Sequence, residues 1–338
     1  MINRRILRIA ALVLFNAAVI AWTAWNEFGK HPSEDPFPEI SRTGLFYIAG
    51  AIGCLLFAIF SGATKYLLMM RAAGEKESLR IALETTILGK YYDYITPSGL
   101  GGEPFQIWWL RRNGYSSGSA GAMPIISFVT TQAGFVVPAI LIMLIWRPEE
   151  LDAVRVSAYI GTVLLLIVPG VLLWFSASPE TARGVITGVV RLGGKLRVIK
   201  NPDRVSGDIL ATLSEYHDSF RILAGHRGLS FVLFLLSVVF RLSFCSIPFF
   251  VLRSMGSEGS FGVVLALSVY LQAAAVLVPT PGNAGAAEGL FYVIFSSIGA
   301  EGVFWAMLIW RLIVFYFFLA AGALIQGFRA AKGFDKLA

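Results

Sequence analysis

Two stretches rich in proline and glycine decide the fold of this chain. TPSGLGGEP occupies residues 96–104, inside an apolar segment at 80–110, and PTPGNAG occupies residues 279–285, inside another at 260–299. Proline removes a backbone donor and clustered glycines free the backbone, so each stretch should end a helix. At membrane depth, such backbone is tolerated only where it packs in protein or lines a cavity. We therefore expect each segment to be a re-entrant hairpin of two half-helices.

The composition around these stretches is that of an integral membrane protein. Of the 338 residues, 56% are hydrophobic and only 14% are charged, and the mean hydropathy is +0.70. About a quarter of the residues of a soluble domain are charged, and the long apolar runs exclude a disordered chain. The net charge is +7. Because the cations lie at the ends of apolar runs, the expected partner is an anionic inner leaflet and not a nucleic acid.

Six further apolar runs have about the length that a helix needs to cross a bilayer. They cover residues 6–28, 44–70, 119–146, 156–176, 229–253 and 303–327. The first run follows three arginines and lacks a small-residue cleavage site, so we expect an uncleaved signal-anchor helix. The predicted fold class is an all-α polytopic membrane protein with six spanning helices and two re-entrant hairpins, which can also be counted as eight helices.

The loops predict the orientation of the chain in the cytoplasmic membrane. Lys and Arg gather before residue 9, in 71–80, at 111–112, in 179–228 and in the C-terminal tail, whereas loops 29–43 and 147–155 are acidic. Basic loops stay on the cytoplasmic side. Both termini should therefore be cytoplasmic, with the first hairpin entering from inside and the second from outside.

This orientation turns residues 44–146 and 229–327 into an inverted repeat. Each region runs helix, broken hairpin, helix, and the two regions cross the membrane in opposite senses. Interrupted segments at matching places in inverted halves indicate a transport site. We expect residues 1–338 to form a single membrane domain.

Residues 179–228 form the predicted cytoplasmic linker between the halves. Residues 181–200 hold five Lys and Arg and no acid, and residues 205–224 place apolar side chains on one helical stripe. Such a segment can lie on the anionic inner leaflet. It can equally be a solvated connector, and the sequence leaves both interpretations open.

Two arginines lie inside apolar runs, Arg241 in 229–253 and Arg311 in 303–327. An arginine near the bilayer centre costs on the order of 3 kcal/mol, so each must face a partner or a wet cavity. One hypothesis is a buried ion pair with Glu103 or Glu288. The other is docking of an anionic headgroup, because guanidinium matches phosphate in bidentate geometry.

The hairpin turns favour the second hypothesis. Glu103 follows Gly101 and Gly102, and Glu288 follows Asn283 and Gly285. A half-helix that begins at each turn would offer free N–H groups and a positive dipole end to an anion. The two carboxylates could offset the arginines, hold a cationic substrate group or carry a coupling proton. The candidate substrate-binding residues are Arg241, Arg311, Glu103, Glu288, Thr96, Gly101, Gly102, Asn283 and Gly285.

Motifs of catalysis, metal binding and cofactor binding give no positive indication. The string Gly114-Tyr115-Ser116-Ser117-Gly118 matches a nucleophile elbow, but it precedes a spanning helix, where a serine N-cap is expected instead. The three histidines lie in polar loops without ligand spacing, and Cys54 and Cys245 lie in apolar runs. We therefore expect no catalytic residue, metal site, disulfide or cofactor.

The two turns also carry a family resemblance. Residues 96–104 resemble the first signature of the lysylphosphatidylglycerol synthase transmembrane family, the flippase-like domain of MprF-type proteins. Residues 281–289 resemble its second signature, with Asn283 where glycine is usual and Ala287 where a basic residue is common, and Trp310-Arg311-Leu312 resembles part of its final helix. Many members carry charges in the helix after the first signature, where this chain has Thr130-Thr131-Gln132.

The resemblance implies movement of an aminoacylated phospholipid, such as lysyl-phosphatidylglycerol, to the outer leaflet. In the family, a separate soluble domain transfers lysine to phosphatidylglycerol. The eleven residues after Gly327 lead us to expect the membrane part alone. Two alternatives stay open. One is a membrane enzyme acting on a lipid or polyprenyl phosphate, with Glu103 or Glu288 as acid or base. The other is an accessory subunit of a separate aminoacyl-lipid synthase.

Overall fold

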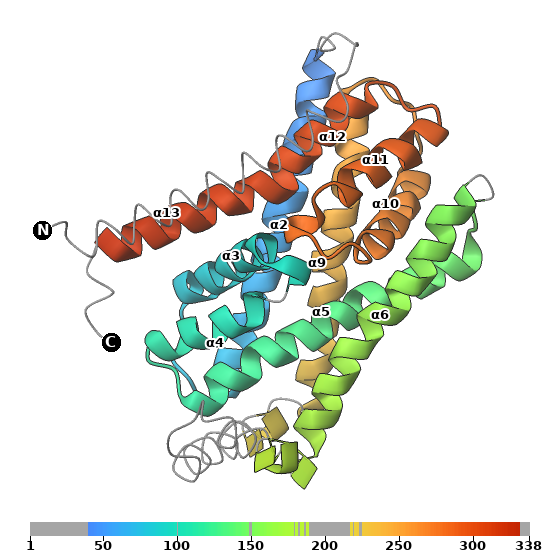
Figure 1. Cartoon of the computed structure of the whole chain (residues 1–338). Coiled ribbons are helices and arrows are strands. Elements are labelled where there is room, and N and C mark those ends of the chain that lie inside the picture. The colour runs from blue at the N-terminus through green and yellow to red at the C-terminus, as the bar shows by residue number, and fades with distance from the viewer. Residues whose placement is uncertain are drawn as a thin grey trace, which may run out of the picture.

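A computed structural model describes residues 40–331, apart from Leu100, residues 149–150 and most of residues 179–224. The predicted signal-anchor run at 6–28 and most of the predicted linker therefore lie outside the described residues. The described part is helical (Figure 1). Its α-helices are α2 (Arg42–Ala72), α3 (Leu79–Ile95), α4 (Gly102–Arg112), α5 (Ser117–Ile145), α6 (Asp152–Ala177), α9 (Arg227–Ser254), α10 (Phe261–Ala275), α11 (Ala286–Ser297), α12 (Val303–Arg311) and α13 (Phe317–Ala331).

Five helical segments of the described chain are long and apolar enough to cross a membrane. They are Arg42–Ala72, Ser117–Ile145, Asp152–Phe175, Arg227–Ser254 and Val303–Arg329. These segments coincide with five of the six apolar runs, and they confirm a multi-pass, all-helical membrane architecture. The last segment joins α12 and α13 through a π-helical turn, η4, at Leu312–Tyr316.

Serine caps fix where several of these helices begin. Ser41 Oγ accepts from the Gly44 amide at 3.0 Å, and Ser116 Oγ accepts from the Ser119 amide at 3.3 Å. Such a side chain satisfies an amide that has no partner within the helix. Ser116 thus caps α5, as predicted. The elbow-like string at residues 114–118 is therefore the loop and first turn before a helix, and not a strand-to-helix turn.

Both predicted breaks are present. Helix α3 ends at Ile95, a short 3₁₀ turn η1 covers Pro97–Gly99, and α4 begins at Gly102. In the second half, α10 ends at Ala275, η3 covers Pro281–Asn283, and α11 begins at Ala286. The two turns, 184 positions apart along the chain from Pro97 to Pro281, contact each other inside the bundle.

Helices α2 and α9 pack along each other at the centre of the bundle, and α5 packs on α9 (Figure 1). Helix α6 lies on the outside against α5 and α10, and its outer face exposes Val163, Trp174 and other large apolar side chains. An apolar face of that size suits lipid tails. The end of α13 packs on the first hairpin, where Tyr92 donates to Gln326 at 3.0 Å and Arg329 pairs with Glu84.

Candidate functional site: a charged cavity inside the bundle

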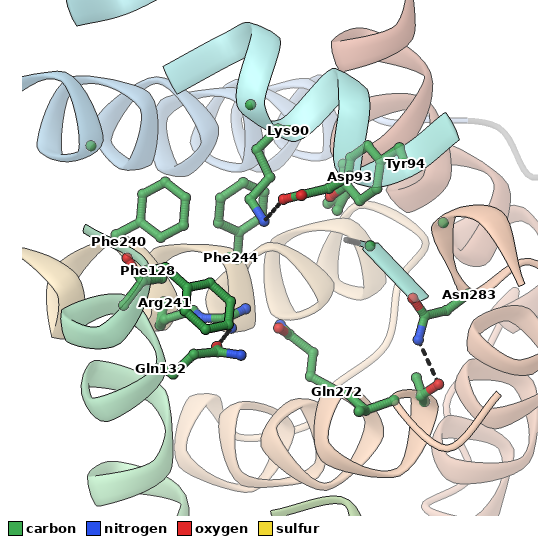
Figure 2. A pocket seen from close by; sticks show the side chains of 18 of the residues that line it. Lys90, Asp93, Tyr94, Phe128, Gln132, Phe240, Arg241, Phe244, Gln272 and Asn283 are labelled. Atoms are coloured by element: carbon green, nitrogen blue, oxygen red, sulfur yellow. Dashed lines mark hydrogen bonds and ion pairs between the residues drawn. The ribbon is translucent and has the colours of Figure 1, made fainter. Parts of the chain in front are cut away.

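A cavity of about 300 Å³, lined by charged, polar and apolar side chains, lies between helices from the two halves of the chain. Its lining comes from α2 to α6 and from α9 to α12, together with the turns that interrupt the two hairpins. Figure 2 shows Lys90 and Asp93 on one side, Arg241 and Gln132 on the other, and Gln272 pointing into the space between. The charged side chains of the described lining are Lys65, Lys90, Asp93, Glu103, Arg241 and Arg311.

Arg311 forms a buried ion pair. Its guanidinium pairs with the Glu288 carboxylate, and the two side chains are only 4% and 3% exposed. Arg311 also donates to the Gly282 carbonyl at 3.3 Å and lies over the rings of Trp310 and Phe315. It immediately precedes the π-helical turn η4, a feature that often accompanies functional sites. Of the two hypotheses for this arginine, the structure contains the ion pair, and its carboxylate is Glu288.

Arg241 has a neutral partner. Its Nη2 donates to Gln132 Oε1 at 2.5 Å, and its guanidinium lies 5.0 Å from the centre of the Phe135 ring. Its buried Nε has no hydrogen-bond acceptor among the described residues. Within that part of the chain, no carboxylate lies at ion-pair distance from Arg241. The second hypothetical ion pair, with Glu103, is therefore not formed.

Lys65 is a further cation of the cavity wall. It lies on α2 with only 1% of its surface exposed. Its ammonium donates to the Ser127 carbonyl at 3.0 Å and to the Thr131 hydroxyl at 2.6 Å. Both acceptors are uncharged, and among the described residues no carboxylate pairs with Lys65. Its two hydrogen-bond partners are thus neutral dipoles.

The carboxylates of the first hairpin lie on the opposite wall. Asp93 pairs with Lys90 at 3.2 Å and accepts from the Gly102 amide at 3.1 Å. Glu103, in the first turn of α4, lines the cavity and is only partly exposed. No described cation lies within ion-pair distance of Glu103. The acidic groups therefore gather on α3 and α4, away from the helix that carries Arg241.

The amides at the half-helix starts already have acceptors. Gly101 donates to Thr96 Oγ1 at 2.9 Å, Gly102 donates to Asp93, and Gly285 donates to Glu288 Oε2 at 2.6 Å. The expectation that these N–H groups are free is wrong at these three positions. The physical reason is that a buried helix start needs acceptors whether or not a ligand is bound.

Comparison with known proteins places the chain in a family. The model of the lysylphosphatidylglycerol synthase TM region matches residues 6–322. The chain belongs to this family. A search of curated proteins finds no match. The match covers both broken hairpins and every residue of the cavity lining, so the cavity is part of the family's membrane region.

Four of the nine predicted site residues line the cavity of this family member: Glu103, Arg241, Asn283 and Arg311. Glu288 lies directly behind Arg311 as its partner. Thr96, Gly101, Gly102 and Gly285 build the turns through the hydrogen bonds above, and Asn283 donates to the Ala275 carbonyl at 2.5 Å. Whether any of the nine contacts a substrate stays a prediction.

Lys65, Lys90, Asp93 and Gln132 also line the cavity, and sequence reasoning did not select them. Lys65 lies seven residues before the end of α2, about 10 Å along the axis, where a lysine can be taken for one that snorkels to the interface. Gln132 was noted only as a departure from the family pattern, and it is the residue that binds Arg241. The signal that could have identified Lys65 and Gln132 is that each is a polar residue within an apolar run.

Proposed function

We propose that this protein moves a phospholipid with a phosphate-bearing headgroup between the leaflets of the cytoplasmic membrane, aminoacylated phospholipids such as lysyl-phosphatidylglycerol included. The observation that carries the proposal is the charged cavity inside the bundle. Four cations and two carboxylates line it. A charge inside a membrane bundle is expensive and marks a substrate path, and an excess of cations fits the phosphate that phospholipids share.

An inverted repeat would let the cavity open to each side in turn. Under that arrangement α2 corresponds to α9 and η1 corresponds to η3. Both of these pairs are in contact, as is required if a pseudo-two-fold axis passes between them. Rocking one half against the other about this axis would expose the cavity alternately. The hairpins would then be re-entrant and both termini cytoplasmic.

Leaflet exchange in liposomes tests the proposal. The full chain is reconstituted with a fluorescent phosphatidylglycerol, and the dye in the outer leaflet is reduced with dithionite. We expect exchange above that of protein-free liposomes, and Arg241→Gln should slow it at least tenfold. The matched control is Arg71→Gln, which removes a cation from the same bundle at an exposed position, where Arg71 pairs with Glu77. Equal exchange by wild type and Arg241→Gln would contradict the proposed site.

Mass spectrometry of the same liposomes separates transport from chemistry. A translocator leaves the lipid masses unchanged while it alters their leaflet distribution. A new covalent species would favour a membrane enzyme that uses Glu103, the cavity carboxylate that has no ion pair with any described residue. Exchange that requires an added soluble aminoacyltransferase would favour the accessory-subunit alternative.

A further inference from the structure

The charges of the cavity wall divide into those that are paired and those that are not. Arg311 is neutralised by Glu288, and Lys90 by Asp93. Lys65 and Arg241 remain without a carboxylate among the described residues, and so does Glu103 on the opposite wall. With these three groups ionised, the unpaired lining charges sum to plus one, the charge that one phosphodiester anion would cancel.

Lys65 and Arg241 also keep unused donors. An ammonium has three N–H groups and a guanidinium has five. Lys65 uses two of its three on Ser127 and Thr131. Arg241 donates through Nη2 to Gln132, while its buried Nε has no described acceptor. Both residues line the cavity, and their partners on α5, Thr131 and Gln132, are adjacent in the sequence.

The carboxylates of the first hairpin do not replace the missing anion. The charge of Asp93 reaches Arg241 only from beyond ion-pair distance, and Asp93 is occupied by Lys90 and the Gly102 amide. Glu103 has Asp93 and Lys90 as charged neighbours on its own hairpin, lies near Tyr66 of α2, and forms no ion pair with Lys65 or Arg241. Two like charges held close together inside a bundle are unfavourable without a counter-ion. The part of the cavity between Lys65 and Arg241 is therefore suited to binding an anion.

We propose that Lys65 and Arg241 together form the anion subsite of the cavity and hold a phosphate group between them. Gln132 and Thr131 orient the two cations from α5. Arg311, in contrast, serves the structure through Glu288. This proposal depends on the proposed function in one respect, the source of the phosphate. The phosphate can belong to a lipid headgroup or be a free phosphate ion.

Binding to the purified full chain in detergent tests the subsite without transport. Inorganic phosphate and dihexanoylphosphatidylglycerol, a soluble short-chain lipid, are titrated by calorimetry. We expect Lys65→Met and Arg241→Gln each to weaken binding of phosphate at least tenfold. Arg71→Gln, the change of an exposed cation on the same helix as Lys65, should alter it less than twofold.

Thermal unfolding shows whether weaker binding comes from loss of the subsite or from a variant that does not fold. Lys65→Met removes an uncompensated charge, so without ligand the variant should unfold at or above the wild-type temperature, and added phosphate should no longer raise that temperature. A folded Lys65→Met or Arg241→Gln protein that binds both probes as wild type does would overturn the subsite.

The outcomes separate the subsite from the proposed function. If probe binding depends on both Lys65 and Arg241 but the wild type shows no leaflet exchange, the subsite is supported and the proposed translocator function is contradicted. A Lys65→Met protein with unchanged leaflet exchange and unchanged binding of both probes sinks the subsite and spares the translocator. Binding of phosphate but not of the short-chain lipid supports the subsite and assigns it to a soluble anion.

Discussion

The first hairpin (α3, η1, α4) and the second (α10, η3, α11) begin from similar sequences and place their carboxylates differently. Each breaks at a Thr-Pro step and carries a glutamate in the first turn of its second half-helix. Glu288 is 2% exposed and pairs with Arg311, whereas Glu103 faces the cavity without an ion pair among the described residues. One carboxylate is thus neutralised within the fold, and the other is the one that we propose for a ligand.

The difference extends to the rest of each hairpin. The first carries Lys90 and Asp93 on the cavity wall, and the second presents the neutral amides of Gln272 and Asn283 there. The first hairpin thus presents charged groups to the cavity, and the second presents neutral ones. Between the two hairpins, we expect the second to contribute more to stability and the first to contribute more to contact with the substrate.

The largest effect should come from Glu288→Gln. This change leaves Arg311 buried without its anion and should lower the free energy of unfolding by about 3–5 kcal/mol. Glutamine keeps an acceptor for the Gly285 amide, so the loss reports the ion pair. The measurement is thermal or denaturant unfolding in detergent. The double variant Glu288→Gln/Arg311→Met should recover much of the loss, and a double variant as unstable as the single one would contradict this account.

An intermediate effect should come from one glycine in each turn. Gly99 (φ +64°) and Gly282 (φ +60°) share a left-handed backbone, but a Cβ at Gly282 would collide with the Phe315 ring, while nothing lies closer than 3.8 Å at Gly99. Alanine at position 99 should cost about 1 kcal/mol, from backbone strain. Alanine at position 282 should cost about 2–4 kcal/mol, because overpacking adds to the strain. The unfolding midpoints of the two variants compare them directly, and equal midpoints would show that Phe315 moves aside.

The smallest effect on stability should come from Glu103→Gln, the counterpart of the first variant. With no ion pair to lose, the free energy of unfolding should change by less than about 1 kcal/mol. The leaflet-exchange rate should nevertheless fall about tenfold if the carboxylate serves the substrate. The two glutamine variants should therefore rank oppositely in unfolding and in exchange. If one variant has the larger effect in both assays, the proposal that the second hairpin serves stability and the first serves the substrate is contradicted.

Local chemistry made the breaks predictable. Pro97 and Pro281 stop helices because proline has no backbone N–H group, and no distant residue can supply that donor. The same holds for the Ser116 cap and for the five apolar runs that became candidate spans. The positions of Arg241 and Arg311 were also evident, because an arginine in an apolar run demands a partner.

Partners could not be predicted in the same way. Gln132, which binds Arg241, lies 109 positions away, and the choice of Glu288 over Glu103 for Arg311 depends on how α11 meets α12. Lys65 joined the site because α2 packs on α9 and its ammonium reaches two acceptors on α5. Such contacts depend on packing that spans the whole chain.

By itself, the sequence determined that this protein is a bundle of membrane helices with two interrupted hairpins, because hydrophobic length and backbone chemistry act over a few residues at a time. The tertiary structure alone decided which charges neutralise each other and which remain in the cavity. Charge interactions inside a membrane bundle are strong, and they act between whichever groups the packing brings together.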